Sequence, residues 1–210
     1  MTVRNRTVRG TVASEHVVQF FDTDESRASN VAAFLAEGHA AGEPIVIIAR
    51  SRNAAAILTA MESLGVPVEA AAEAGQLVVK DAMDTLHALS RSGAPAADLF
   101  ERVIGRELAA LARRGRRIRA YGEMVDILAQ RGDLPDAIAL EALWNNLGER
   151  LPVMLLCGYS AAHFVSTGTH RALLEICAAH SQVHRHEQDP LAGWLLSAAH
   201  TSTSVTPILH

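Results

Sequence analysis

The segment Ile45-Val46-Ile47-Ile48-Ala49, apolar at every position, constrains the fold more than any other part of the chain. A strand with one face in water alternates apolar and polar residues, so this run predicts a strand that is covered on both faces. Helical periodicity on either side of the run places a helix between successive strands. The pattern predicts a three-layer α/β fold, with a mostly parallel sheet of about five or more strands and helices on both faces.

The other strands of this sheet are expected where short apolar runs alternate with helical segments. Ser26 is expected to cap the first helix, and Gly42 to end it, because glycine readily adopts a left-handed conformation. Asp98 is expected to cap a longer helix, and Pro135 to begin another. A last helix is expected within 169–187. The remaining predicted strands are 16–21, 76–82, 118–121 and 153–157.

The chain has 210 residues, of which 49% are hydrophobic, and this is enough for one substantial core. We expect a flexible N-terminal arm over 1–14, one domain over 15–187 and a C-terminal tail over 188–210. The tail carries an apolar group around Trp194, which either docks on the domain or binds a partner. No segment resembles a signal peptide or a membrane span, so we expect a soluble cytoplasmic protein.

The charge balance gives no general reason to expect nucleic-acid binding. The chain has 19 Lys and Arg against 23 Asp and Glu, a net charge of −4, and Lys80 is its only lysine. One basic cluster interrupts this pattern. It is either a solvated turn or a docking surface for an acidic partner or nucleic acid, and its residues are Arg113, Arg114, Arg116, Arg117 and Arg119.

The first strand and helix are arranged as in a phosphate-binding α/β protein, but the connection between them is unsuited to phosphate. It reads Asp22-Thr23-Asp24-Glu25-Ser26, without the glycines and the lysine that cradle phosphate groups. Its carboxylates would repel a phosphate. The sequence therefore predicts that another ligand, or none, occupies this end of the sheet.

Ligands of parallel α/β sheets bind beyond the carboxyl ends of the strands. Glu123, directly after a strand and Gly122, is the sharpest candidate for a ligand, water or metal contact, although it could instead cap the next helix. No catalytic constellation is recognisable, and none is predicted. The candidate ligand-binding residues are His16, Phe21, Asp22, Asp24, Tyr121, Glu123, Met124, Cys157 and Tyr159.

Histidines near the end of the chain raise the question of a metal site. His180 and His184 are four residues apart and are expected to share a helix face, with His186 nearby. Two histidines do not complete a zinc site, so no metal is predicted, and a packed His180 with solvated His184 and His186 is the alternative. Cys157 ends an apolar strand and reads as a buried, inert thiol or as a redox sensor.

The segments "RIRAYGEMVDILAQRG" and "LLCGY", with "HVVQFFDTDES" and "AAHSQV" in the same order, resemble the MEDS family of sensory domains over residues 15–187. The resemblance implies a RecA/KaiC-like fold without a Walker A loop, and a sensor of small hydrocarbon derivatives. Leu140 and Ser160 depart from the family pattern. The matching positions are His16, Phe21, Gly42, Glu43, Gly122, Glu123, Met124, Glu141, Cys157, Tyr159 and His180.

We therefore predict a non-enzymatic sensory or regulatory domain that binds a small ligand or a signalling partner at the carboxyl edge of the sheet. The implied partners are a histidine kinase or a transcription regulator in bacterial signal transduction. One alternative is a nucleotide switch in which Asp22, Asp24 and Glu123 hold magnesium. A second is a nucleic-acid adaptor that uses the arginine cluster. No cofactor is predicted, and the oligomeric state is left open.

Overall fold

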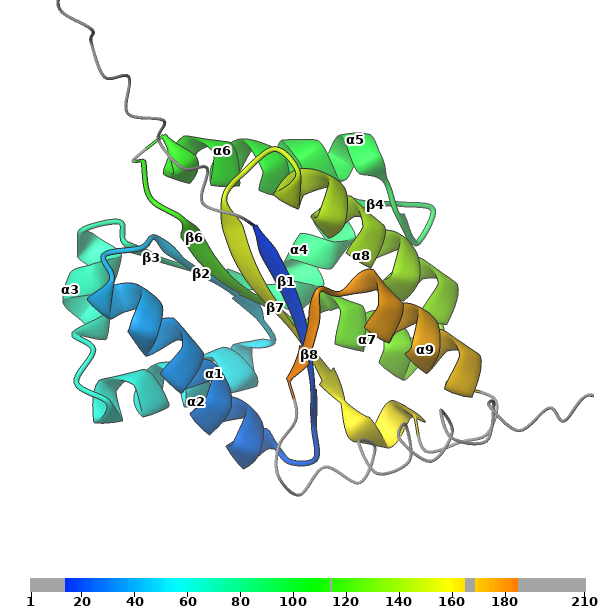
Figure 1. Cartoon of the computed structure of the whole chain (residues 1–210), viewed down its shortest axis with the longest axis horizontal. Coiled ribbons are helices and arrows are strands. Elements are labelled where there is room, and N and C mark those ends of the chain that lie inside the picture. Colours follow the sequence, from blue (N-terminus) through cyan, green and yellow to red (C-terminus); the bar gives the residue numbers. More distant parts are fainter. Residues whose placement is uncertain (1–13, 114, 165–168, 185–210) are drawn as a thin grey trace, which may run out of the picture.

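The computed structural model describes residues 14–113, 115–164 and 169–184, and its core is a parallel sheet with helices on both faces (Figure 1). The strand order is β3-β2-β6-β7-β1-β8, and every pair of neighbours is parallel. This confirms the predicted α/β architecture. The strands are β1 (Glu15–Phe21), β2 (Ile45–Ala49), β3 (Leu77–Asp81), β6 (Ile118–Gly122), β7 (Val153–Ser160) and β8 (Gln182–His184).

Side chains that alternate along the strands build two separate cores. Val17 and Phe21 of β1 pack on one face of the sheet, whereas Val18 and Phe20 pack on the other. The first face is covered by α1 (Asp24–Ala40), α2 (Ser51–Ser63) and α3 (Val68–Glu73). The second is covered by α4 (Ala82–Ala88), α5 (Ala97–Phe100), α6 (Arg106–Ala112), α7 (Met124–Arg131), α8 (Leu134–Gly148) and α9 (His170–Ala179).

Several predicted boundaries are wrong. Thr23, not Ser26, caps α1: the Thr23 hydroxyl accepts the Ser26 backbone N–H at 3.1 Å, and Ser26 closes the capping box. Asp98 is not the cap of its helix, which begins after Ala96. The segment expected as one helix over 169–187 contains α9 and then the sixth strand, β8. Gly42 does end α1, with a φ of 69°.

Two further features were not expected. A short helix, α3, follows Pro67, and a π-helical segment, Glu101–Gly105, joins α5 to α6. Gly93 lies at the tip of a small antiparallel hairpin formed by β4 (Ser90–Arg91) and β5 (Ala94–Pro95). Within the described residues, no helix combines the length and the apolar character needed to cross a membrane.

A buried arginine fixes α1 against β6. Arg119 is 5% exposed, its Nε donates to Glu43 Oε2 at 2.7 Å, and its Nη1 donates to the Phe34 carbonyl at 2.9 Å. The guanidinium also lies over the Phe34 ring, 4.8 Å from its centroid. Gly38 permits this approach, because a Cβ there would stand 2.5 Å from Arg119 Cδ and 2.9 Å from Ile45 Cδ1.

Gly38→Ala is expected to destabilise the protein, although alanine normally favours a helix interior. The added methyl group would displace an arginine whose position is set by Glu43 and Phe34, and such overpacking costs about 1–3 kcal/mol. Urea unfolding followed by circular dichroism measures the change. Gly105→Ala is the matched control and should cost less, since the atoms nearest to its Cβ belong to the carboxylate of Glu101, the end of a flexible and partly exposed side chain. A Gly38→Ala protein as stable as the wild type would contradict the packing described here.

Candidate functional site

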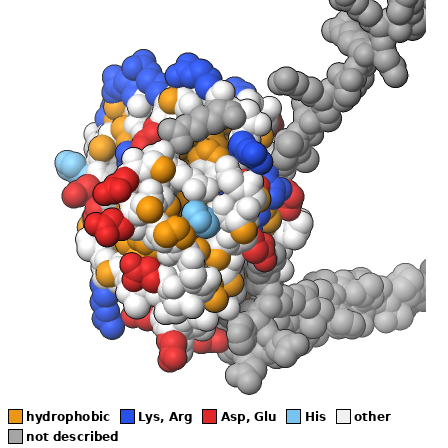
Figure 2. Space-filling model, turned by 90° about the vertical axis from the view of Figure 1, so that its left-hand side faces the viewer, with side chains coloured by type: hydrophobic (Ala, Val, Ile, Leu, Met, Phe, Trp, Pro, Cys, Tyr) orange, Lys and Arg blue, Asp and Glu red, His pale blue; other side chains and the backbone are white. Residues whose placement is uncertain are grey.

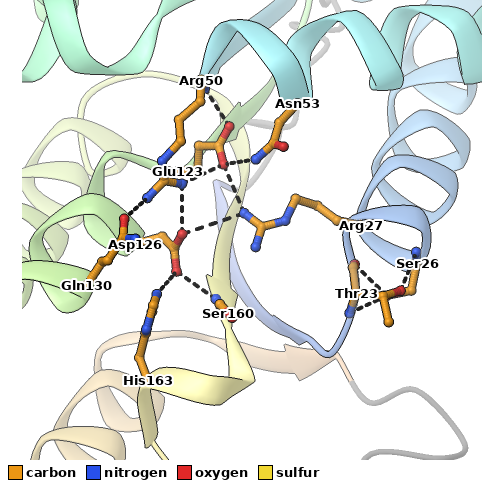
Figure 3. A network of polar contacts seen from close by, with 10 residues as sticks. All are labelled: Thr23, Ser26, Arg27, Arg50, Asn53, Glu123, Asp126, Gln130, Ser160 and His163. Carbon is orange, nitrogen blue, oxygen red and sulfur yellow. Dashed lines mark hydrogen bonds and ion pairs between the residues drawn. The ribbon is translucent and has the colours of Figure 1, made fainter.

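The Glu123 carboxylate lies at the carboxyl edge of the sheet, buried beneath the start of α1 and α2 (Figure 3). Glu123 follows β6 directly but makes no cap hydrogen bond to its own helix, α7. It accepts instead from the Arg50 backbone N–H at 2.6 Å, from Asn53 Nδ2 at 2.7 Å and from Arg27 Nη1 at 2.9 Å. Glu123 therefore occupies the N-cap position of α7, as one reading expected, but its carboxylate binds groups of α1 and α2 instead of the amides of α7.

Asp126, one turn further along α7, extends this network to the end of β7. It accepts from Arg50 Nη1 at 2.8 Å and from the Ser160 backbone N–H at 2.6 Å, and its Oδ1 is 3.2 Å from His163 Nε2. Arg50 also donates to Gln130. We call Arg27, Arg50, Asn53, Glu123 and Asp126 the edge network, and it connects α1, α2, α7 and β7.

The positive and negative charges within the edge network balance each other. Two carboxylates, Glu123 and Asp126, face two guanidinium groups, and the Arg50 side chain is the more accessible of these, at 26% exposure. Beneath them the hydroxyl of Tyr121 is buried and has no hydrogen-bond partner among the described residues. Burial and the nearby Glu123 carboxylate raise the pKa of Tyr121 far above its usual range, so the phenol stays neutral. The network offers ion pairs rather than a free base or nucleophile.

A groove opens beside the edge network, between α1 and α2. Its volume is about 330 Å³, and alanines line it together with charged and polar side chains. Asn53 belongs to both the groove and the edge network, because its amide donates to Glu123. The lining residues are Asp24, Glu25, Ala28, Ser29, Arg52, Asn53, Ala56 and Ala60.

The predicted ligand-binding residues do not form one site. Phe21 and Tyr121 are buried on the α1–α2 face, and Met124 is buried on the opposite face. Asp22 and Asp24 are exposed, whereas Glu123 is fully buried. The three carboxylates proposed for magnesium therefore do not converge, because the Glu123 side chain points inward to the two arginines.

His16, Cys157 and Tyr159 lie instead in a second buried cluster, on the α8–α9 face, around the carboxylate of Glu141. The Glu141 Oε1 atom accepts from the Tyr159 hydroxyl at 2.7 Å, and Oε2 from the Cys157 thiol at 3.2 Å. The Nε2 atoms of His16 and His180 approach the two carboxylate oxygens at 3.2 Å and 3.4 Å. We call His16, Glu141, Cys157 and His180 the His–Glu–Cys cluster.

The acid–base properties of this cluster follow from burial and from its contacts. Burial would raise the pKa of Glu141, but the close approach of the His16 and His180 rings holds it well below its usual range. Burial and the Glu141 charge raise the pKa of Cys157, which argues against a reactive thiolate there. Although burial opposes it, the Glu141 carboxylate raises the pKa of His180.

The expected pairing of His180 with His184 on a helix face is wrong. His180 stands just after α9, which ends at Ala179, and its backbone is extended. His184 belongs to β8, so the helical spacing does not apply. His186 and Trp194 lie outside the described residues, as do Arg114, most of the predicted N-terminal arm and the whole predicted tail.

Several residues of the arginine cluster form hydrogen bonds within the protein. Arg117 Nε donates to Glu43 at 3.0 Å, and Arg116 Nη1 donates to the Ala41 carbonyl at 3.0 Å. Arg119 is buried on the same glutamate, whereas Arg113 is exposed. In Figure 2, Lys and Arg side chains gather along the top of the view, at the end of the molecule where the strands begin. The basic surface is thus remote from the edge network.

Sequence reasoning missed several residues of the two clusters. Arg27 and Asn53 lie on helices, three residues after Asp24 and after Arg50, in segments read only for their apolar faces. Asp126 had a usable signal, because it follows Glu123 by three residues and so shares its helix face. Asn145, which contacts His16, is one turn of α8 beyond Glu141 and carried the same kind of signal.

Comparison with known proteins agrees with this description. No curated protein matches the chain. Among solved structures, the KaiC-like protein PH0186 from the hyperthermophilic archaeon Pyrococcus horikoshii OT3 is similar, with a TM-score of 0.52 and 19% sequence identity over 85% of this chain and 76% of that one. This similarity shows a KaiC-like fold. The model of the MEDS family, the methanogen/methylotroph, DcmR sensory domain, matches residues 15–181, and the chain therefore belongs to this family of sensory domains.

Proposed function

We propose that this protein is a non-catalytic sensory domain that binds a small organic ligand in the α1–α2 groove and transmits its binding through the edge network. The position of Asn53 carries the proposal. Its side chain lines the groove and donates to Glu123 at 2.7 Å, so a ligand in the groove touches a group that holds the network together. Membership of a sensory family supports the same function.

The groove suits a compact ligand with an apolar part and a polar group. Ala28, Ala56 and Ala60 provide apolar contacts, and Arg52 and Asn53 provide hydrogen-bond donors. A ligand switches a protein only if it binds two conformations with different affinities. Competition for the Asn53 amide would supply that difference, because it weakens one of the bonds that fix α2 to Glu123. A signalling partner would then bind differently according to the position of α2 relative to α7.

Titration with short-chain alcohols, amines and carboxylic acids, followed by ¹H–¹⁵N NMR, tests this site. A binding compound is expected to shift the Asn53 side-chain amide and the Arg50 backbone amide, which both donate to Glu123. Ala56→Trp should fill the groove and abolish these shifts. Ala55→Trp is the matched control, since Ala55 is exposed on α2 but does not line the groove. No response to the panel, or equal responses in both variants, would refute the proposed site.

Glu123→Gln is expected to destabilise the domain by about 3–5 kcal/mol, because it leaves the buried Arg27 with one carboxylate fewer. Chemical unfolding measures this loss. Asp24→Asn removes an exposed ion pair with Arg52, 3.6 Å long, and should cost at most about 1 kcal/mol. Similar effects of the two substitutions would show that the edge network does not hold the helices together.

ATP and GTP, with or without magnesium, are expected to leave the melting temperature unchanged. The β1–α1 connection offers no lysine, and Thr23 caps the Ser26 amide in the first turn of α1, beside Asp24 and Glu25. The carboxylates of Asp24 and Glu25 would repel a phosphate at this helix start. A concentration-dependent rise in melting temperature that Glu123→Ala abolishes would favour a nucleotide switch instead.

A further inference from the structure

We propose that the His–Glu–Cys cluster is a transition-metal site, suited best to Zn²⁺, in which His16, Glu141, Cys157 and His180 are the four ligands. Among the residues described, this is the one group of three or more His, Cys, Asp or Glu side chains whose ligand atoms converge, all within 4.8 Å of one another. The site lies beneath α8 and α9, whereas the edge network lies at the carboxyl edge of the sheet, and it goes beyond the sensory function proposed above.

The spacing of the ligand atoms fits a small tetrahedral ion. Ligands bound to Zn²⁺ at about 2.0–2.3 Å in a tetrahedron stand about 3.3–3.8 Å apart. His16 Nε2 is 3.2 Å from Cys157 Sγ and 3.2 Å from Glu141 Oε2, and the thiol and the carboxylate are also 3.2 Å apart. His180 Nε2 is 3.4 Å from Glu141 Oε1. The other ligand-atom pairs lie within 4.8 Å of one another, so movements of up to about 1 Å would complete the coordination.

Both histidines are held in the tautomer that binds a metal through Nε2. Asn145 Nδ2 donates to the Ala179 carbonyl at 2.8 Å, which fixes the orientation of its amide and leaves Oδ1 as the acceptor for His16 Nδ1, at 2.8 Å. His180 Nδ1 donates to the Ile176 carbonyl at 2.6 Å. With the protons on Nδ1, each neutral ring presents a lone pair on Nε2, the arrangement that outer hydrogen bonds give to metal-binding histidines.

Without a cation, the centre of the cluster is poorly satisfied. The side chain of His180 is fully buried, and its Nε2 has no hydrogen-bond partner among the described residues. Neutral His16 and His180 would direct lone pairs at the carboxylate of Glu141, which is itself an acceptor. A metal ion between these atoms removes the conflict, and Zn²⁺ balances the charges of one carboxylate and one thiolate.

The ligand set also indicates the class of metal. Imidazole and thiolate ligands select Zn²⁺ and similar transition metals, whereas Mg²⁺ and Ca²⁺ prefer oxygen ligands. A groove of about 570 Å³ gives access, because His16 and His180 line it together with Asn145 and Ser181. The groove thus reaches the two histidines at the amino end of β1, whereas Glu141 and Cys157 lie fully buried behind them.

Cobalt titration of the metal-stripped, tag-free chain tests the site. Co²⁺ bound to these ligands should give the visible d–d bands of a tetrahedral ion and a near-ultraviolet thiolate-to-cobalt charge-transfer band, both saturating at one ion per chain. Zn²⁺ should displace the cobalt and raise the melting temperature. Elemental analysis of protein purified without chelators should find zinc at the same ratio.

Matched variants assign the ligands. Cys157→Ser should remove the charge-transfer band, and His180→Gln should weaken binding at least tenfold, because each deletes one ligand. Cys177→Ser and His87→Ala, substitutions outside the cluster, should leave the spectrum unchanged, and circular dichroism should show that all four variants are folded. Absence of tetrahedral cobalt bands in the wild type, or a charge-transfer band that persists in Cys157→Ser, overturns the proposal. Neither result bears on the α1–α2 groove.

Discussion

The register in which β1 pairs with β7 positions both polar clusters. Val18 stands opposite Cys157, and Phe21 stands opposite Ser160. Because side chains alternate between the faces of a sheet, this register directs His16, Cys157 and Tyr159 toward α8 and α9. It also brings the Ser160 N–H to Asp126 at the carboxyl edge. A slip of one residue would turn the thiol toward α1 and deprive Glu141 of two donors.

A single glycine makes this pairing compatible with the aromatic residues on the other face. A Cβ at Gly158 would stand 2.6 Å from the Tyr121 hydroxyl and 3.1 Å from a ring carbon of Phe21. Tyr121 and Phe21 therefore occupy the space above β7 that a side chain would fill, and Arg27 lies over the Phe21 ring, 5.4 Å from its centroid. The edge network thus rests on aromatic packing that only glycine at this position allows.

The sequence predicted the parts of the fold that depend on local pattern. The apolar run Ile45–Ala49 identified a central strand correctly, since burial on both faces leaves a signal in five consecutive residues. Gln182–His184 carries no such signal, because this strand is short, polar and at the sheet edge. The clusters were harder to predict. Cys157 contacts His16, which is 141 residues away in the sequence, and Arg27 contacts Glu123, which is 96 residues away. Only the topology of the fold reveals these contacts.

This domain buries two groups of charges, and each constrains the positions of the residues around it. Desolvating an ion pair costs free energy that its mutual attraction only partly recovers, so apolar residues would give equal or greater stability. The ion pairs contribute directional contacts instead. A carboxylate that accepts from several donors fixes the positions of the helices and strands that carry those donors. Tyr159 and Ser160 are adjacent on β7, and one donates to Glu141 while the other donates to Asp126. A displacement of this strand end would therefore alter both clusters together, because it moves a donor to Glu141 and a donor to Asp126 at once.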